Sequence, residues 1–195
     1  QTSRGFVGAK QVLNATAGWG STIAAMAGIH LPMTTFPLQA CVTAPHTPFL
    51  PTVVVSGSLH ESGSQSDRGE LVTGASVDPF ASYSMAGSLS FLEEISGHLL
   101  ELFPCLSQVR ILRQWAGLCE MPPDFSPIMG LTPVEGFLID TGWGTYGFKA
   151  SPICGKTLAA LIATGRTPEL IAPFRLSRFA EGQLVGEKGA ASVGH

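Results

Sequence analysis

The sequence predicts a mixed fold of the α/β or α+β class, and three features of its 195 residues lead to this class. A short apolar strand, a turn of small residues and a helix follow one another twice, at residues 11–27 and 136–164. Between them, β-branched and apolar runs broken by prolines fill residues 34–75, which favours neighbouring strands of an antiparallel or mixed sheet. An amphipathic helix is predicted after residue 90.

Composition narrows the class of protein further. The chain is 45% hydrophobic and 13% charged, which is enough apolar material for a real core. A formal net charge of −3 argues against an electrostatic nucleic-acid surface. No apolar run reaches the roughly 18 residues of a membrane-spanning helix. The 23 glycines and 14 prolines indicate many turns rather than a bundle of long helices.

The four cysteines show no metal-binding spacing, and no metal site is predicted. They stand at positions 41, 105, 119 and 154, each beside apolar residues, so we expect buried, reduced thiols and a cytoplasmic protein. A disulfide stays open as an alternative. The chain begins with Gln1 and has no signal peptide, so we expect the natural start to lie further upstream.

The first strand–turn–helix unit starts with a buried strand at residues 11–15. It continues through the turn at 16–20 into a helix from about residue 21 to 27. Ser21 is the predicted N-cap of this helix and Gly28 its stop. Taken alone, the unit is an ordinary connection between a strand and a helix.

The β-rich middle is predicted to hold strands at residues 36–43, 52–56 and 69–75, with a polar turn at 61–68. His60 stands just before that turn. A lone histidine of this kind is more often a hydrogen-bonded structural residue than a functional one, although a position facing a flavin or a partner chain is the alternative.

The next segment is predicted to be a helix followed by a returning strand. Ser90 and Glu93 fit a capping box, leucines and isoleucine recur at helical spacing, and Pro104 ends the run. Residues 109–120 then favour a strand. In the proline-rich turn after it, Asp124 is expected to bond turn amides rather than act in catalysis.

The most informative stretch is the second glycine turn, after the strand predicted at residues 136–140. Glycines at 142, 144 and 147 let the backbone approach a ligand, and Lys149 adds a positive charge. The helix predicted at 152–164, with Pro152 in its first turn and Gly165 as C-cap, offers N–H groups to anionic or carbonyl oxygens. Suitable ligands for this turn are flavin oxygens, a phosphate or a substrate carboxylate. The alternative is a plain tight turn with a solvated lysine.

Three motifs in order carry a family resemblance: residues 113–117 read RQWAG, 123–130 read PDFSPIMG, and 142–149 read GWGTYGFK. Together they resemble the C-terminal half of the FAD-dependent amine and amino-acid oxidases of the D-amino-acid oxidase type. Within that group the chain is most similar to the beta subunits of heterotetrameric sarcosine oxidases, from about Asn14 to residues 187–191.

The resemblance implies a division of the chain. Residues 1–33 would be part of the FAD-binding domain, 34–115 the mixed substrate-domain sheet with its packed helix, and 116–165 the return to the FAD domain. Residues 166–195 would form a tail that contacts its own domain or another subunit.

The resemblance also assigns site residues. Lys149 falls on the family's lysine beside the flavin and the substrate carboxylate, and is the expected catalytic residue. The other cofactor-binding candidates are small or flanking residues of the motifs and turns. They are Gly144, Thr145, Gly147, Phe148, Gly117, Ala17 and Gly18, together with Lys149 itself.

The implied reaction is oxidation of the C–N bond of sarcosine by hydride transfer to FAD, giving glycine and formaldehyde or methylenetetrahydrofolate. FMN at a subunit boundary, tetrahydrofolate and NAD on a partner subunit, and alpha, gamma and delta type subunits belong to the same expectation. Two alternatives stay open: a related enzyme acting on proline, hydroxyproline, dimethylglycine or glycine, and a non-catalytic remnant.

Two departures qualify the resemblance. Tyr146 stands where the relatives would have glycine, which leaves the size of the amine pocket undecided. No GxGxxG motif with a following ribose-binding acid is present, and by the resemblance the histidine that carries FMN in the relatives corresponds to a position upstream of Gln1. The chain therefore corresponds to about the second half of such a subunit, and we expect it to need an N-terminal half to hold FAD.

Overall fold

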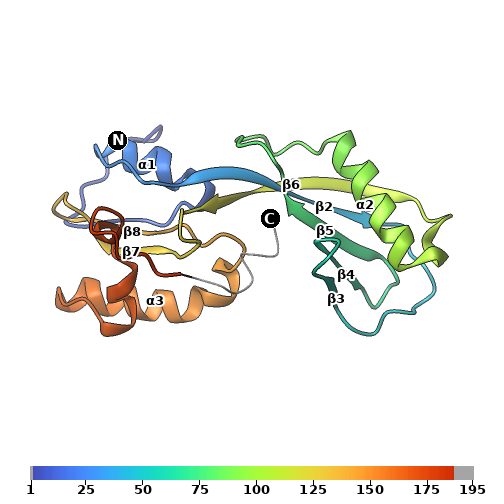
Figure 1. The fold of residues 1–195 in the computed structure, drawn as a ribbon. Helices are drawn as coiled ribbons and strands as arrows, with labels where there is room; N and C mark the ends of the chain where they lie inside the picture. Colours follow the sequence, from blue (N-terminus) through green and yellow to red (C-terminus); the bar gives the residue numbers. More distant parts are fainter. Residues whose placement is uncertain (1, 187–195) are drawn as a thin grey trace. The chain divides into compact units, whose positions relative to one another are not determined.

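The computed structural model describes residues 2–186, apart from the side chains of residues 75 and 76. The described chain separates into two compact units. Of the described residues, 2–34 and 120–186 belong to the first unit and 35–119 to the second. Figure 1 labels the α-helices and strands β2 to β8 of these units.

The first unit is a three-layered arrangement around a three-stranded sheet in the order β1–β8–β7. The strands are β1 (Val12–Asn14), β7 (Ile128–Leu131) and β8 (Phe137–Thr141). The β1–β8 pair is parallel and the β7–β8 pair is antiparallel. Alternate residues of β7 and β8 point to opposite faces, so each face needs its own cover.

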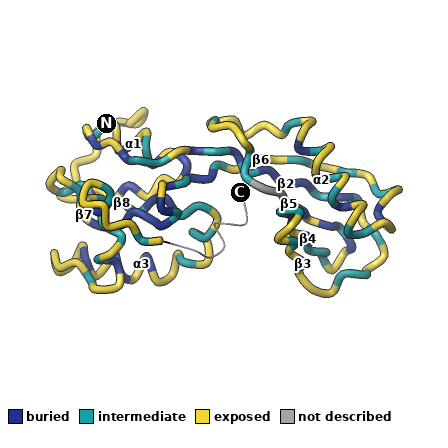
Figure 2. Tube along the Cα trace, viewed as in Figure 1, coloured by how far each residue is buried: buried dark blue, intermediate teal, exposed yellow. Residues whose placement is uncertain are grey.

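Helices on both faces supply that cover. Helix α3 (Gly147–Thr164) contributes Leu158 and Leu161 to a core that includes Leu138 of β8. On the other face, α1 (Gly20–Met26) contributes Ala24 to a core that includes Ile139. Figure 2 shows the buried course of β7 and β8 between these layers.

The tail of the described chain folds onto its own unit. It forms two short 3₁₀ helices, η3 (Glu169–Phe174) and η4 (Leu176–Phe179). Ile171 packs in the α3 core and Phe179 against the α1 core. The rest of the expected tail, with the end of the family resemblance at 187–191, lies outside the described residues.

The second unit is a five-stranded sheet in the order β3–β4–β5–β2–β6. These strands are β2 (Thr34–Thr43), β3 (Val54–Ser56), β4 (Glu61–Gln65), β5 (Leu71–Val77) and β6 (Ile111–Met121). The β3–β4, β4–β5 and β2–β5 pairs are antiparallel. Helix α2 (Leu89–Leu102) buries Phe91, Ile95 and Leu99 in a core with Cys41 and Leu71. The described helices and strands thus form mixed sheets with packed helices, and the predicted α+β class is confirmed.

Several local predictions are wrong in detail. Strand β4 occupies part of the predicted polar turn. The prediction missed it because its serine- and glycine-rich sequence lacks the apolar alternation of a strand. His60 lies just before this strand with φ 51°. Ser21 lies inside α1 rather than capping it, since the helix starts at Gly20 with Trp19 as N-cap. In α2 the cap is Ser88, whose side chain accepts from the N–H of Phe91.

Two further corrections concern α3 and the thiols. Helix α3 starts at Gly147, so Pro152 lies inside it, although Gly165 caps it with φ 68° as predicted. All four cysteines are free, and Cys105 is exposed rather than buried because it follows the end of α2 in a short 3₁₀ turn, η2 (Pro104–Leu106). Within residues 2–186, no helix has the length and apolar composition that crossing a membrane requires.

Candidate cofactor-binding site

The glycine turn between β8 and α3 needs glycine at two positions for backbone reasons. Gly142 has φ +74° and Gly144 has φ +54°, a left-handed region that costs other residues about 1–2 kcal/mol. A Cβ at position 142 would also lie 2.6 Å from Pro122 Cγ. At position 144 the nearest atom, Met121 Sδ, would be 3.5 Å away, which is ordinary contact. The turn therefore brings open backbone to the start of α3.

The N-terminus of α3 has no side-chain cap, although the N–H groups of Lys149 and Ala150 donate to the carbonyl of Tyr146 at 3.1 and 3.3 Å. Tyr146 is its N-cap residue and makes no capping hydrogen bond through its side chain, and the first turn carries no acidic residue. Phe148 and Lys149 lie in this turn, exposed, and Phe148 is 93% exposed. The first N–H groups of a helix seek acceptors, and the positive end of the helix dipole favours anions. This end of α3, with the Lys149 ammonium, is thus suited to bind negatively charged or carbonyl oxygens.

A part-buried hydrogen bond fixes the shape of the glycine turn. Trp143 Nε1 donates to Asp140 Oδ1 at 2.6 Å, which ties the turn to the last residues of β8. Burial raises the pKa of Asp140, and the hydrogen bond from Trp143 opposes that rise. The turn is therefore held from within and does not depend on a ligand for its conformation.

The first turn, between β1 and α1, shows backbone strain. Ala17 has φ 45°, which is rare for a residue with a side chain, and Gly18 beside it is buried. Asn14 holds the turn closed: its Nδ2 donates to the Gly20 carbonyl at 2.9 Å, and its Oδ1 accepts from Thr16 Oγ1 at 2.7 Å. Strain that surrounding bonds maintain is a feature of binding and catalytic sites.

Glu120 joins the two turns, and sequence reasoning missed it. The residue is buried, with 4% of its surface exposed. One oxygen accepts from the Gly20 N–H at 3.1 Å, and the other accepts from Thr141 Oγ1 at 2.5 Å and the Gly142 N–H at 2.8 Å. Burial raises the pKa of Glu120, against the effect of these hydrogen bonds. The available signal was one acidic residue in an otherwise apolar strand end, LCEMPP.

The first unit thus brings most predicted site residues to two neighbouring turns. Ala17 and Gly18 lie in one turn, and the candidates from Gly144 to Lys149 lie in or after the other. Gly117 is separate, because it lies on the part of β6 that belongs to the second unit. Its backbone is open there, since a Cβ would meet no atom within 4 Å.

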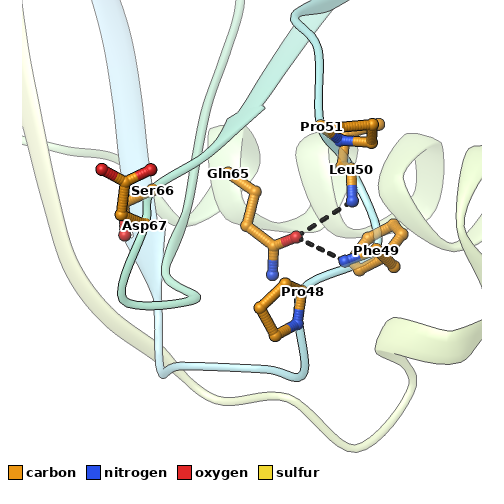
Figure 3. Close-up of a pocket in the computed structure, with 7 residues that line it drawn as sticks. All are labelled: Pro48, Phe49, Leu50, Pro51, Gln65, Ser66 and Asp67. Atoms are coloured by element: carbon orange, nitrogen blue, oxygen red, sulfur yellow. Dashed lines mark hydrogen bonds between the residues drawn. The ribbon is translucent and has the colours of Figure 1, made fainter.

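A hollow in the second unit contains none of the predicted site residues. It lies between the proline-rich segment at 48–51 and residues 65–67, as Figure 3 shows. Gln65 Oε1 accepts from the N–H groups of Phe49 at 2.9 Å and Leu50 at 3.1 Å. Because its amide nitrogen donates to backbone carbonyls, Gln65 serves to hold the segment rather than a ligand.

Comparison with protein families gives the class of protein to which this fold belongs. The model of the family described as FAD dependent oxidoreductase (DAO) matches residues 1–161, so the chain belongs to this family.

Individual proteins and solved structures show which members of this family the chain is similar to. The chain is 45% identical over 194 residues to "Sarcosine oxidase subunit beta" of Rhodobacter capsulatus, covering all of this chain and 47% of that protein. It is 42% identical over 195 residues to the protein of the same name from an Arthrobacter species, covering 48% of it. Among solved structures, L-proline dehydrogenase from P. horikoshii superposes with a TM-score of 0.82 at 29% identity, over 90% of this chain and 48% of that one. The chain spans about half the length of the relatives it matches.

Proposed function

We propose that this chain is the second half of a flavin-dependent amine oxidoreductase that oxidises the C–N bond of sarcosine to give glycine and formaldehyde or methylenetetrahydrofolate. The observation that carries the proposal is the glycine turn leading into the lysine-bearing end of α3, which no side chain caps. The similarity to two proteins named sarcosine oxidase subunit beta supports the choice of amine.

The residues at the end of α3 fit a bound flavin. The backbone at Gly144, where an added Cβ would meet no atom closer than 3.5 Å, lets a planar ring approach, and the first N–H groups of α3, which no side chain caps, are donors for its carbonyl oxygens. The exposed ring of Phe148 and the neighbouring Thr145 would contact the cofactor and lose their exposure to water. When bound, FAD accepts the hydride of the amine substrate.

Lys149 is the proposed catalytic residue. Its ammonium stands exposed in the first turn of α3, where the positive end of the helix dipole adds to its charge. It would hold the carboxylate of the amino acid and favour negative charge as it develops on the flavin. Ala17, Gly18 and Gly117 are the remaining proposed contacts to FAD.

The edge of the first sheet supports the need for a second half. Among the described strands, β1 pairs only with β8 and therefore forms an open edge of the sheet, which a further strand can extend. Its residues Val12 and Leu13 are 50% and 36% exposed. Further strands with the dinucleotide-binding turn would pair with this edge and cover these side chains.

The partners follow from the names of the relatives, which are called subunit beta. We propose assembly with alpha, gamma and delta type subunits in the cytoplasm, FMN at a subunit boundary, and tetrahydrofolate and NAD on a partner subunit. The described part of the C-terminal segment packs on its own unit.

A second function is favoured by a specific observation. L-proline dehydrogenase from P. horikoshii has the same fold over 90% of this chain at 29% identity, so a cyclic secondary amine is a competing substrate. Tyr146, whose ring lies at the start of α3, would set the room for such a ring. A panel of sarcosine, proline, hydroxyproline, dimethylglycine and glycine, followed by anaerobic bleaching of the flavin, distinguishes these substrates.

The test of the proposal uses the full-length protein with its N-terminal half and partner subunits. We expect a bound flavin band, and we expect Lys149→Met to slow flavin reduction by the amine by about 100-fold or more. Lys156→Met is the matched control, because Lys156 is exposed on the same helix but lies two turns further on. A colourless assembly would favour the non-catalytic remnant, and unchanged reduction in Lys149→Met would refute the role of Lys149.

A further inference from the structure

Glu120 contacts both candidate cofactor turns at once. Its carboxylate accepts from Gly20 in one turn and from Thr141 and Gly142 in the other. Its backbone carbonyl accepts from the N–H of Gly144 at 3.1 Å. Gly20 and Glu120 are 100 residues apart in sequence, and Gly142 is 22 residues beyond Glu120. One side chain therefore fixes the spacing of two segments that are remote in the chain.

The packing around this carboxylate leaves no alternative at Gly20. A Cβ at that position would lie 2.2 Å from Thr141 Oγ1 and 2.6 Å from Glu120 Oε1. Distances this short require a shift, either of these two side chains, which would disturb their hydrogen bonds, or of the first turn away from the carboxylate. The close approach of α1 thus depends on glycine, and the position of its first turn depends on the acceptor at Glu120.

The hydrogen bonds of the Glu120 carboxylate are also unusual for a side chain with a purely structural role. No cation neutralises the carboxylate in the described structure: its donors are two amides and a hydroxyl, and the charged group that acts on it is Asp140, of the same sign. Burying a carboxylate without a partner cation opposes folding. Polar groups of this kind concentrate at functional sites, where position matters more than stability.

We propose that Glu120 is a positioning residue for FAD, which sets the separation between the Ala17–Gly20 turn and the Gly142–Gly144 turn so that both can contact one cofactor. The inference rests on the proposed function and deepens it, because it names a residue that does not touch the flavin but determines how well the two turns hold it.

The chemistry of the carboxylate gives a specific substitution test. Its two oxygens accept from donors of both turns, whereas a glutamine amide has one acceptor and one donor group. Glu120→Gln keeps the size of the side chain but sets an NH₂ group against the N–H of Gly20 or of Gly142. Glu120→Asp keeps both acceptors on a stem one carbon shorter. Thr141→Val removes only the hydroxyl donor and leaves both backbone amides bonded.

The experiment measures FAD binding to the full-length apoprotein by visible absorbance and circular dichroism. Loss of one hydrogen bond to a charged acceptor corresponds to about tenfold or more in affinity, so we expect Glu120→Gln to weaken FAD binding by about that factor. Glu120→Asp should recover part of the loss. In the flavin-free protein, hydrogen exchange should rise in peptides covering 17–21 or 141–144.

Asp124→Asn is the matched control, because Asp124 is another buried carboxylate of the same unit, and its bonds go to Arg178, Ser126 and Val185. It should lower the unfolding midpoint without changing the circular dichroism of bound FAD. If Glu120→Gln changes only the unfolding midpoint, as this control does, the inference is wrong while the proposed function stands. If the wild-type assembly binds no flavin, both are wrong.

Discussion

The buried pair of Asp124 and Arg178 gives the sharpest quantitative prediction. Arg178 is fully buried and donates from Nε to Asp124 Oδ2 at 2.7 Å and from Nη2 to Oδ1 at 2.9 Å. It also donates to the carbonyls of Ser126 at 2.8 Å and Phe174 at 2.9 Å. The pair thus joins the turn before β7 to the C-terminal segment, 54 residues away.

We predict that Arg178→Met lowers the free energy of unfolding by about 3–5 kcal/mol, because it leaves the Asp124 carboxylate buried without its cation. With a urea slope of about 2 kcal/mol per molar, the unfolding midpoint should fall by about 1.5–2.5 M. The assay is urea unfolding of the full-length protein followed by tryptophan fluorescence. Arg175→Met is the control, since its ion pair with Glu181 is 42% and 40% exposed and should contribute less than about 1 kcal/mol.

A second substitution tests whether the buried charge is the cause. Asp124→Asn added to Arg178→Met removes that charge while an amide oxygen still accepts from the turn, so the double variant should be more stable than Arg178→Met alone. Burial by itself would raise the pKa of Asp124, but the hydrogen bonds from Arg178 and its charge outweigh this and lower it. The stabilisation is therefore present above the unfolded pKa of about 3.9 and is lost as pH falls through the folded value. A loss below 1 kcal/mol in Arg178→Met, or an additive double variant, would refute the reasoning.

Three further predictions concern the turn, the thiols and the second unit. Gly142→Ala should lower the free energy of unfolding by about 2–5 kcal/mol, because of backbone strain and contact with Pro122. The control Gly155→Ala should raise it slightly, since a Cβ there meets no atom within 4 Å, and equal effects of the two variants in urea unfolding would contradict the prediction. Titration with a thiol reagent should show one fast thiol, Cys105, since the other three are buried, and fast modification of more than one would oppose the structure. Burial raises the pKa of Glu61, so the stability of the second unit should fall as pH rises from about 4.3 through the folded pKa. Glu61→Gln should remove this dependence of stability on pH. Parallel pH profiles of the wild type and the variant would disprove the prediction.

Local chemistry made much of the fold predictable. Gly165 was identified as the C-cap of α3 because a left-handed residue is needed there, and its φ of 68° meets that need. Strand β8 and the long strand β6 follow from apolar and β-branched runs. Strand β4 was not predicted, since a run of serine, glycine and glutamine becomes a strand only because β3 and β5 pair with it on either side.

The start of α3 is a helix boundary that the local sequence does not predict. Pro152 suits a first helical turn, but the helix begins five residues earlier at Gly147, where Tyr146 offers no capping side chain. Tertiary contacts of Trp143, which packs in the α3 core and bonds Asp140, decide where the chain enters the helix. The same early start places Lys149 within the first turn and so gives the candidate site its charge at the helix end.

By itself, the sequence determined the class of fold, the family resemblance and the glycine turn with its lysine, because these depend on residue types at short spacing. Only the tertiary structure decided that Glu120 joins the two turns and that Asp124 binds Arg178. The partners in these bonds are separated by 22 to 100 residues, and no periodicity or motif connects positions so far apart. A hydrogen-bond partner at that distance is set by how the strands and helices pack, which is a property of the whole unit.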